Sequence, residues 1–192
     1  MDDISRMEQY LNEHIDGRRL IHSKRTADEA VSLAQRYGED GKKALIAGLL
    51  HDIAKGVCKH GLQKVSKKYS VSVDAVEMDN PELLHGKIGA AMVKADLGIE
   101  DEDILSAIRW HTTGRAGMSM LEKIIYIADL IEPGRDFEGI NDVRVLAYKD
   151  IDEAMLFALE QVMEFVKNKG FSLHPKSIEA YEDILKRRNQ KV

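Results

Sequence analysis

Apolar residues recur along most of the chain at the three- and four-residue spacing that predicts amphipathic helices. The segment 28–38, DEAVSLAQRYG, follows this spacing and closes with Gly38, a residue type common at helix ends. The segment 44–56, ALIAGLLHDIAKG, begins apolar on all sides, which favours a buried helix that runs on to Gly56. The first third of the chain is therefore expected to be helical.

Three further helices are expected in the second half of the chain. Ser119 and Glu122 have the spacing of a capping box at the start of SMLEKIIYIADLIEPG, which stops at Pro133-Gly134. The segment 150–170 has the pattern of a long amphipathic helix, and a final helix is expected over about 176–188. Two alternating apolar runs joined by a hairpin turn do not occur in the sequence, so we expect no sheet.

The pattern predicts one all-α domain over residues 1–192, with a core of about 18–135 and C-terminal helices of about 140–188 completing the bundle and its pocket. The chain is 44% apolar and 32% charged, which is typical of a globular protein that buries a sizeable core. Its net charge of −5 offers no general attraction to nucleic acid or to an anionic membrane. No apolar run approaches the ~20 residues of a membrane span.

Cysteine content and the N-terminal residues predict a cytoplasmic location. Cys58 is the single cysteine, so an internal disulfide is impossible and a reducing compartment is favoured. The acidic start, MDDISRMEQYLNEH, lacks the apolar core of a signal peptide. The basic run 59–68 and the LKRR segment favour solvated helix faces over an RNA-binding surface.

His51 and Asp52 lie side by side directly after the most apolar stretch of the sequence. An ionised carboxylate in apolar surroundings costs several kcal/mol or more unless a partner satisfies it. Either the pair lies at a surface end of its helix, or a cation binds both side chains. As a dipeptide alone, His-Asp is a weak signal.

Asp129 gives a sharper argument, because its neighbours in the predicted helix are Ile127, Ala128, Leu130 and Ile131. A carboxylate there needs a counter-charge, either a metal ion or a side chain such as Arg135 or a lysine. Imidazole and carboxylate donors suit Fe, Mn, Zn and similar ions, and bundle cores hold such sites. The residues that could converge on one cation from separate helices are His22, His51, Asp52 and Asp129.

Two more histidines, His85 and His111, lie between Asp52 and Asp129 in the sequence and could complete a second metal site or hold a phosphate. Taken one at a time, His22 or His85 is more often a histidine satisfied within its own helix. The order H…HD…H…H…D resembles the HD-domain superfamily of metal-dependent phosphohydrolases. Over about 19–181 the chain resembles the YqeK family, the symmetrical diadenosine tetraphosphate hydrolases. The segments that resemble this family are RLIHS, NPELLHGKIGA, IRWHTTGRAGMSMLEKIIYIADLIEPGR and HPKSIEAY.

The resemblance implies an α-helical HD-domain bundle with its metal site in the core, and cleavage of diadenosine tetraphosphate to two ADP. It implies an iron-preferring divalent centre of one ion or two, with Mn, Co, Ni or Zn as substitutes. The implied metal ligands are His22, His51, Asp52 and Asp129. The implied catalytic residues are Asp52, Lys55, His85 and His111. The implied substrate contacts are Arg19, His22, Asp52, Ile53, Ala54, Lys55, His85, His111, Thr112, Asp129, Arg135, Ser172, Leu173, His174, Pro175, Lys176 and Ser177.

Other functions stay open at the level of the sequence. An HD phosphohydrolase could act instead on a nucleoside mono- or triphosphate, because specificity lies in the pocket and not in the ligand set. A nucleotide-binding or assembly module without turnover is a second alternative, which the complete set of ligand positions opposes. The apolar stripe over 155–166 favours core packing, although it could also serve a homodimer.

Overall fold

In the computed structural model, residues 3–57 and 59–190 are described, and all of their regular elements are helices. Cys58 lies outside the described residues. The first helices are α1 (Asp3–His14), α2 (Gly17–Tyr37), α3 (Gly41–Leu50), the 3₁₀ helix η1 (Ile53–Gly56), α4 (Lys59–Lys68), α5 (Ala75–Asp79) and the 3₁₀ helix η2 (Pro81–Leu83). They are followed by α6 (Leu84–Leu97), α7 (Glu102–Trp110), α8 (Met120–Ile131), α9 (Ile140–Lys149), α10 (Ile151–Asn168) and α11 (Pro175–Asn189). The predicted all-α fold class is confirmed.

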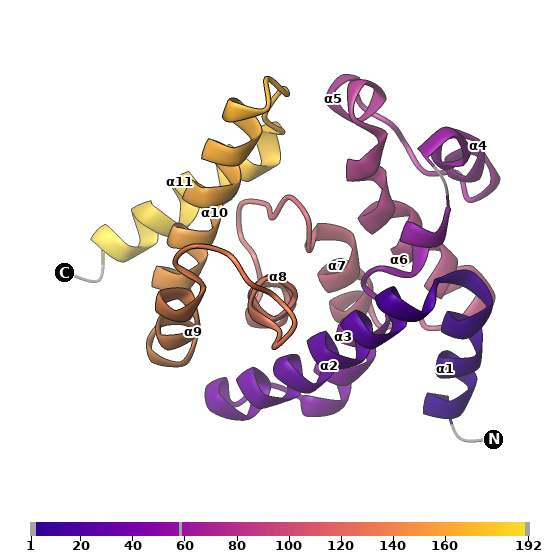
Figure 1. The fold of residues 1–192 in the computed structure, drawn as a ribbon, viewed down its shortest axis with the longest axis horizontal. Helices are drawn as coiled ribbons and strands as arrows, with labels where there is room; N and C mark the ends of the chain where they lie inside the picture. Colours follow the sequence, from indigo (N-terminus) through magenta and orange to yellow (C-terminus); the bar gives the residue numbers. More distant parts are fainter. Residues whose placement is uncertain (1–2, 58, 191–192) are drawn as a thin grey trace.

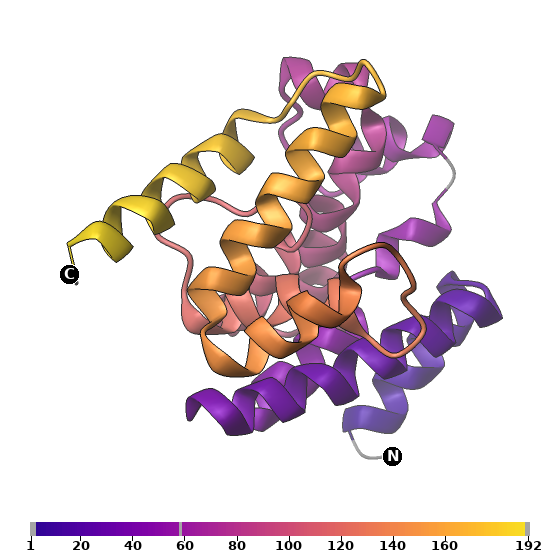
Figure 2. The ribbon, with the colours of Figure 1, turned by 60° about the vertical axis from the view of Figure 1, so that its left-hand side comes forward.

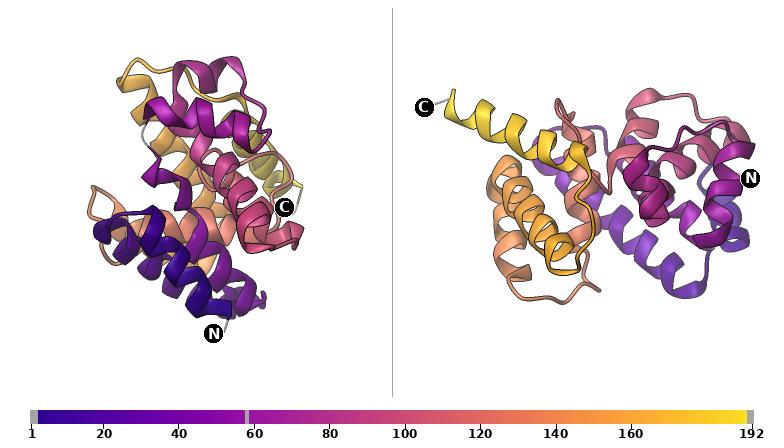
Figure 3. Two further views of the ribbon diagram at one scale, coloured as in Figure 1. Left: turned by 90° about the vertical axis from the view of Figure 1, so that its right-hand side faces the viewer. Right: turned by 90° about the horizontal axis from the view of Figure 1, so that it is seen from above.

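Helix α8 lies at the centre of the bundle, where it contacts α2, α3, α7, α9 and α10 (Figure 1). Helices α2 and α3 pack closely, since a Cβ added to Gly48 would lie 2.8 Å from the Cα of Ala27. In the view from above, α9, α10 and α11 lie on one side of α8, and the elements from α1 to α7 lie mainly on the other (Figure 3). The central position of α8 explains why its sequence is apolar almost throughout.

Buried apolar side chains from α1 to α11 form one continuous cluster, which extends from Met7 to Ile184. Helices α10 and α11 pack against each other and cover the bundle from outside (Figure 2). Of the apolar stripe 155–166, Met155 and Leu159 are buried in this cluster, whereas Phe165 is 59% exposed. None of the described helices is both long enough and apolar enough to cross a membrane.

Local sequence accounts for most of the helix ends. Ser119 and Glu122 form the predicted capping box of α8. Gly38 ends α2 in the left-handed conformation, with φ of 70°, as its position predicted. The final helix, predicted over about 176–188, extends from Pro175 to Asn189.

The prediction of one helix over 44–56 was wrong at its end. Helix α3 stops at Leu50, and the chain turns through His51 and Asp52 into η1. The His51 ring accounts for the break, because its Nδ1 donates to the carbonyl oxygen of Gly48 at 2.7 Å, within the last turn of α3. The turn places His51 and Asp52 beyond the helix end, where both side chains can face the same point.

Candidate metal centre and active site

Four side chains from three separate segments converge beside the N-terminal half of α2. The Nε2 atom of His22 lies 3.0 Å from Oδ1 of Asp129 and 3.3 Å from Nε2 of His51. Asp52 Oδ2 lies 3.9 Å from His22 Nε2 and 3.8 Å from His51 Nε2. His51 Nε2 is also 3.7 Å from Asp129 Oδ1. The structure thus brings together the four residues proposed as metal ligands.

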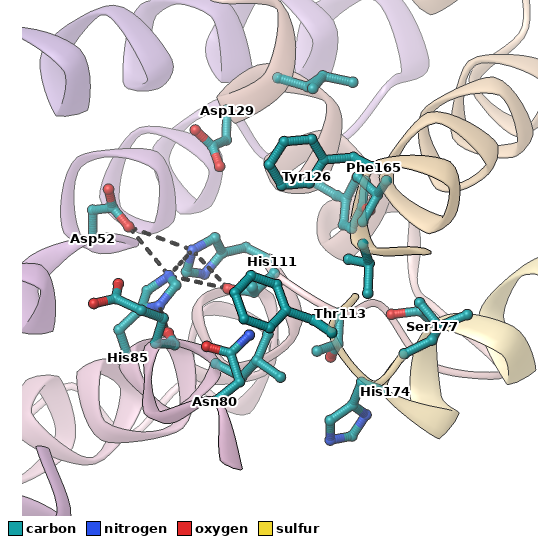
Figure 4. Close-up of a pocket in the computed structure, with 18 of the residues that line it drawn as sticks. Asp52, Asn80, His85, His111, Thr113, Tyr126, Asp129, Phe165, His174 and Ser177 are labelled. Atoms are coloured by element: carbon teal, nitrogen blue, oxygen red, sulfur yellow. Dashed lines mark hydrogen bonds and ion pairs between the residues drawn. The ribbon is translucent and has the colours of Figure 1, made fainter. Parts of the chain in front are cut away.

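A second histidine pair adjoins the same carboxylate. His85 Nε2 and His111 Nε2 are 2.9 Å apart, and they lie 3.4 Å and 3.6 Å from Asp52 Oδ1 (Figure 4). The Thr112 hydroxyl lies 3.0 Å from His85 Nε2 and 3.2 Å from His111 Nε2. Asp52 therefore presents one oxygen to the His22 and His51 side and the other to His85 and His111.

Hydrogen bonds on the far side of each ring fix which nitrogen faces the centre. The Nδ1 atoms of His51, His85 and His111 donate to the carbonyl oxygens three residues earlier, those of Gly48, Glu82 and Ile108. A carbonyl oxygen can only accept, so these Nδ1 atoms carry hydrogen and neutral rings leave the Nε2 lone pair free. The His22 Nδ1 faces Glu132 Oε1 at 3.2 Å in the same way. In the neutral form of each ring, the Nε2 lone pair can therefore bind a metal ion, and the four Nε2 atoms face one region.

Electrostatics around the centre keep the carboxylates charged. Burial opposes ionisation of Asp129, but the hydrogen bond with His22 and nearby positive charge, including that of Arg135, hold the pKa of its carboxyl well below its usual range. For Asp52, burial is likewise outweighed by His51, His111 and His85, so the pKa is well below the ordinary value.

The histidines divide by environment. Burial lowers the pKa of His51 and lowers the pKa of His85 to about 3, so both rings are neutral near pH 7. Burial opposes protonation of His22 as well, but the adjacent carboxylates of Asp129 and Glu132 raise its pKa above the ordinary value. The two ionised carboxylates and the neutral rings of His51 and His85 form an electron-rich cluster that favours a bound cation.

The donor set fits a divalent transition metal. Donors at right angles and about 2.1 Å from an ion lie about 3 Å from one another, close to the shorter distances in this cluster. Nitrogen and carboxylate donors suit Fe, Mn, Co, Ni and Zn. His51, Asp52 and His111 form a further convergent group, which includes one histidine from each side of Asp52. Hydrogen bonding of His22 to Glu132 and of His51 to Gly48 supplies the outer support that metal-binding imidazoles need.

A cavity of about 540 Å³ opens beside the centre and is lined by Asp52, His85, His111 and Asp129 (Figure 4). Its opposite wall is apolar and comes from α10 and from the segment that connects α10 to α11. The residues of that wall are Val162, Phe165, Val166, Phe171 and Leu173. A polar floor facing an aromatic wall is suited to a ligand that joins a phosphate chain to a flat ring.

Several predicted substrate contacts also line this cavity, namely Lys55, Thr112, Arg135, Ser172, Leu173, His174 and Ser177. Arg135 Nη2 lies 2.5 Å from Asp129 Oδ1, so the arginine faces the same carboxylate as His22. Arg19 approaches from α2, with Nη1 3.7 Å from Asp52 Oδ2. Both arginines place positive charge next to the carboxylates of the centre.

Six predicted contacts lie outside the cavity lining, namely Arg19 and His22, which are described above, and Ile53, Ala54, Pro175 and Lys176. The side chains of Ile53 and Ala54 are completely buried in the core. Pro175 begins α11, and the Lys176 ammonium pairs with Glu179 at 2.7 Å. Ile53 and Ala54 face the core because η1 carries them inward after its turn, and Lys176 reaches a carboxylate within its own helix.

Sequence reasoning missed three features of the site. Glu132, 3% exposed, orients His22 and also accepts from the Gly134 N–H at 2.6 Å. Tyr126 lines the cavity, and its buried hydroxyl has no hydrogen-bond partner among the described residues. Phe165 lies on a helical stripe that reads as core. The position of Glu132, directly before Pro-Gly at the end of the helix, could have indicated a role in the site. The sequence around Tyr126 and Phe165 contains no such indication.

His174, which lines the cavity, contacts a segment that is distant in sequence. His174 Nε2 donates to Asp74 Oδ2 at 3.0 Å, and its Nδ1 accepts from the Lys176 N–H at 3.1 Å. Glu77 belongs to the same group, but Lys87 Nζ pairs with its carboxylate at 2.6 Å. The lysine already meets this charge, so the group ties the α10–α11 connection to α5 and is not a second metal centre.

Comparison with known proteins places the chain among enzymes of one type. The HD domain family matches residues 19–134. The chain is 40% identical over 175 residues, 91% of each chain, to "Bis(5'-nucleosyl)-tetraphosphatase, symmetrical" of Bacillus subtilis. A protein of the same name from Halalkalibacterium halodurans is 38% identical over 177 residues, 92% of this chain and 94% of that one. A crystal structure from Clostridium acetobutylicum, titled as a predicted HD superfamily hydrolase involved in NAD metabolism, has a TM-score of 0.93 and 41% identity, covering 97% of this chain and 99% of the other.

Proposed function

Since this chain belongs to the HD-domain family, we propose that it hydrolyses diadenosine tetraphosphate symmetrically to two molecules of ADP. The observation that supports this most is the cavity that has the His-Asp centre on one side and aromatic side chains on the other. The relatives named as symmetrical tetraphosphatases match about nine tenths of the chain. The fold, the site and the relatives therefore agree on one reaction class.

In the proposed reaction, a water oxygen forms a bond to one of the two central phosphorus atoms. The bond from that phosphorus to the oxygen bridging the second and third phosphates breaks, and the departing ADP takes up the proton. A bound divalent metal would lower the pKa of a water ligand toward neutrality and polarise a phosphoryl oxygen. The residues proposed to hold it are His22, His51, Asp52 and Asp129.

Positive side chains would neutralise the phosphate chain beside this centre. Arg135, which lines the cavity and contacts Asp129, offers a planar fork of N–H donors to phosphate oxygens. Lys55 lines the same cavity, with its ammonium 3.8 Å from Glu82, and supplies a point charge. If the substrate's phosphate groups replaced Asp129 and Glu82 as the partners of Arg135 and Lys55, both side chains would bind the substrate.

His85 and His111 have two roles that the geometry supports. Two facing Nε2 lone pairs 2.9 Å apart repel each other, and either a metal cation or a proton stabilised by a bound phosphate would relieve this repulsion. In the second case the pair would share the proton and bind the phosphate, with the Thr112 hydroxyl beside it. A cation there makes a second metal site that shares Asp52 with the first.

We propose iron as the physiological metal, because the mixed imidazole and carboxylate donors suit it and the YqeK-like motifs imply it. The number of ions would be read from metal analysis of the protein and of a His111→Ala variant. One bound ion in both would assign His85 and His111 to phosphate. A second ion in the native protein that the variant lacks would assign them to metal.

The proposed location is the cytoplasm, which rests on the single cysteine of the sequence. The proposed partners are the nucleotide substrate and a second copy of the chain. Val145, 68% exposed, and Tyr148, 38% exposed, form part of an apolar hollow with Ile131 and Pro133, which supports a homodimer more than the stripe over 155–166 does. Sedimentation at micromolar concentration measures this state directly.

The test is to load the purified protein with Fe²⁺ without oxygen, add diadenosine tetraphosphate and separate the products by anion exchange. ADP as the sole nucleotide product, lost in Asp52→Ala and on chelation, is the expected result. AMP plus ATP would contradict symmetrical cleavage while keeping a phosphohydrolase. NAD⁺, nucleoside monophosphates and triphosphates serve as competing substrates, and faster turnover of any of them would replace the proposed substrate.

A further inference from the structure

A second hollow also adjoins the metal centre. It has a volume of about 530 Å³ and is lined by one face of α2 and by residues 132, 134 and 135 after α8. Arg135 lines both this hollow and the deep cavity, and His22 of the metal centre lines this one. The two hollows therefore meet at the centre where cleavage is proposed.

The α2 wall of the second hollow is a stripe of Arg18, Ile21, His22 and Arg25, spaced so that all four lie on one helix face. Ile21 is 53% exposed, an open apolar surface between two arginines. A Cβ added to Gly134 would collide with the Arg25 guanidinium, so that guanidinium lies directly against the glycine.

The charges of Arg18 and Arg25 are not taken up by other parts of the described chain. Neither side chain makes a hydrogen bond or an ion pair with a described residue, whereas Arg19 and Arg135 contact Asp52 and Asp129. Arg25 and Glu132 both lie close to Gly134, but the Glu132 carboxylate already accepts from His22 and from the backbone of Gly134. Two exposed guanidinium groups are thus available to an anionic ligand.

We propose that this second hollow, the arginine groove, binds the second nucleoside diphosphate half of a dinucleoside polyphosphate. The inference rests on the proposed function, because a substrate with two identical halves needs two binding regions on either side of the cleaved bond. Arg18 and Arg25 bind phosphate and stack on the base, since a guanidinium plane does both. Ile21 supplies the apolar surface beneath that base.

The phosphate chain then passes from the deep cavity, along Arg135, into the arginine groove. Arg135 lies at the meeting point, with its Nη2 3.5 Å from His22 Nε2. The volumes of the two hollows are about 540 and 530 Å³. Each lies within the range of roughly 300–1,000 Å³ typical of small-molecule sites.

The test compares Arg18→Ala/Arg25→Ala with Lys24→Ala in the metal-loaded protein. Lys24 is a matched control because it also removes an exposed positive charge from α2, but its ammonium points to Glu8 at 2.7 Å. Two substrates separate the halves: diadenosine tetraphosphate, which has both nucleosides, and adenosine tetraphosphate, which has one. The double variant should lower kcat/KM for the first by about tenfold or more, the effect of one lost charge-assisted hydrogen bond. It should lower kcat/KM for the second by a clearly smaller factor, because that substrate keeps phosphates for the two arginines but has no second base to stack on them, and Lys24→Ala should leave both unchanged.

Calorimetric titration with ADP gives a readout that does not depend on turnover. The native protein should bind two ADP molecules per chain, and the double variant should bind one. Native turnover with a single ADP site, or an equal loss on both substrates, would overturn the arginine groove and leave the proposed function intact. No turnover of diadenosine tetraphosphate by the native protein would overturn the proposed function, whereas two ADP sites reduced to one would still support the groove.

Discussion

At the scale of single residues, Tyr126 combines a structural cost with a place in the active-site cavity. Its hydroxyl is buried without a partner among the described residues, and burial raises the pKa of Tyr126, so the group stays a donor. An unpaired buried hydroxyl costs about 1–3 kcal/mol. Tyr126→Phe should therefore raise the free energy of unfolding of the nucleotide-free protein by about 1 kcal/mol and weaken ADP binding several-fold.

Urea denaturation and calorimetric titration with ADP measure the two effects. Tyr181→Phe is the matched control, because that hydroxyl already donates to Glu160 at 2.6 Å and lies outside the cavity lining. The control should lose a little stability and bind ADP normally. If Tyr126→Phe lost stability and kept full ADP affinity, the hydroxyl would be satisfied in the free protein and would have no role in binding.

At the scale of elements, Arg144 of α9 holds the segment between α8 and α9 beside the candidate metal centre. This guanidinium donates to the carbonyl oxygens of Ile131, Glu132 and Arg135 at 3.1, 3.2 and 3.1 Å. The same segment carries the Glu132 carboxylate that orients His22. Arg144→Ala should lower metal affinity by about tenfold, because outer contacts of a metal ligand typically contribute that much.

Competition with a coloured chelator measures this affinity. Arg36→Ala removes a similar arginine-to-carbonyl contact, from Arg36 to Tyr148 at the other end of α9, where no site residue lies. Both variants should lose stability, and Arg144→Ala alone should lose metal affinity. An equal metal affinity in the two variants would show that the segment keeps His22 and Asp129 in place without Arg144.

Three of the four candidate ligands are unusual in their own neighbourhood. Asp129 stands among apolar residues of α8, and His51 and Asp52 directly follow an apolar stretch, so the local pattern indicated a partner for them. His22 has no such local signal and was predicted from the order of the motifs along the chain. The end of α3 could not be predicted, because it depends on a ring-to-carbonyl bond that propensity does not encode. Contacts between segments distant in sequence could not be predicted either, because, for example, the His174–Asp74 hydrogen bond joins residues a hundred positions apart.

Phe165 is a residue whose surroundings the sequence predicts wrongly, because its local pattern is that of a core residue. Its position in α10 continues the stripe that Met155 and Leu159 bury, so the helical pattern reads it as core. Its actual surroundings depend on how α10 packs against α8, which the sequence of α10 alone does not determine. The aromatic wall of the cavity therefore emerges only from the packed fold.

At the scale of the whole molecule, metal binding should be coupled to folding. The donors come from α2, from the turn after α3 and from α8, so an ion that satisfies them ties together the central helices of the bundle. A ligand that binds only the folded state at a concentration of 100 Kd stabilises it by about 2.7 kcal/mol. For a chain of this size that corresponds to a rise in Tm of roughly 5–10 °C.

Calorimetry of the chelated protein with and without added Co²⁺ should show one transition that moves upward by this amount. Asp129→Asn should unfold in one transition whose Tm no longer responds to Co²⁺, because the centre has lost a charged donor while the bundle remains. Two separate transitions would contradict the single domain predicted over residues 1–192 and would indicate that the C-terminal helices unfold alone. A single transition is expected because the buried apolar cluster runs without a break from α1 to α11, so the C-terminal helices that supply the cavity wall cannot leave without exposing the core that holds the metal centre.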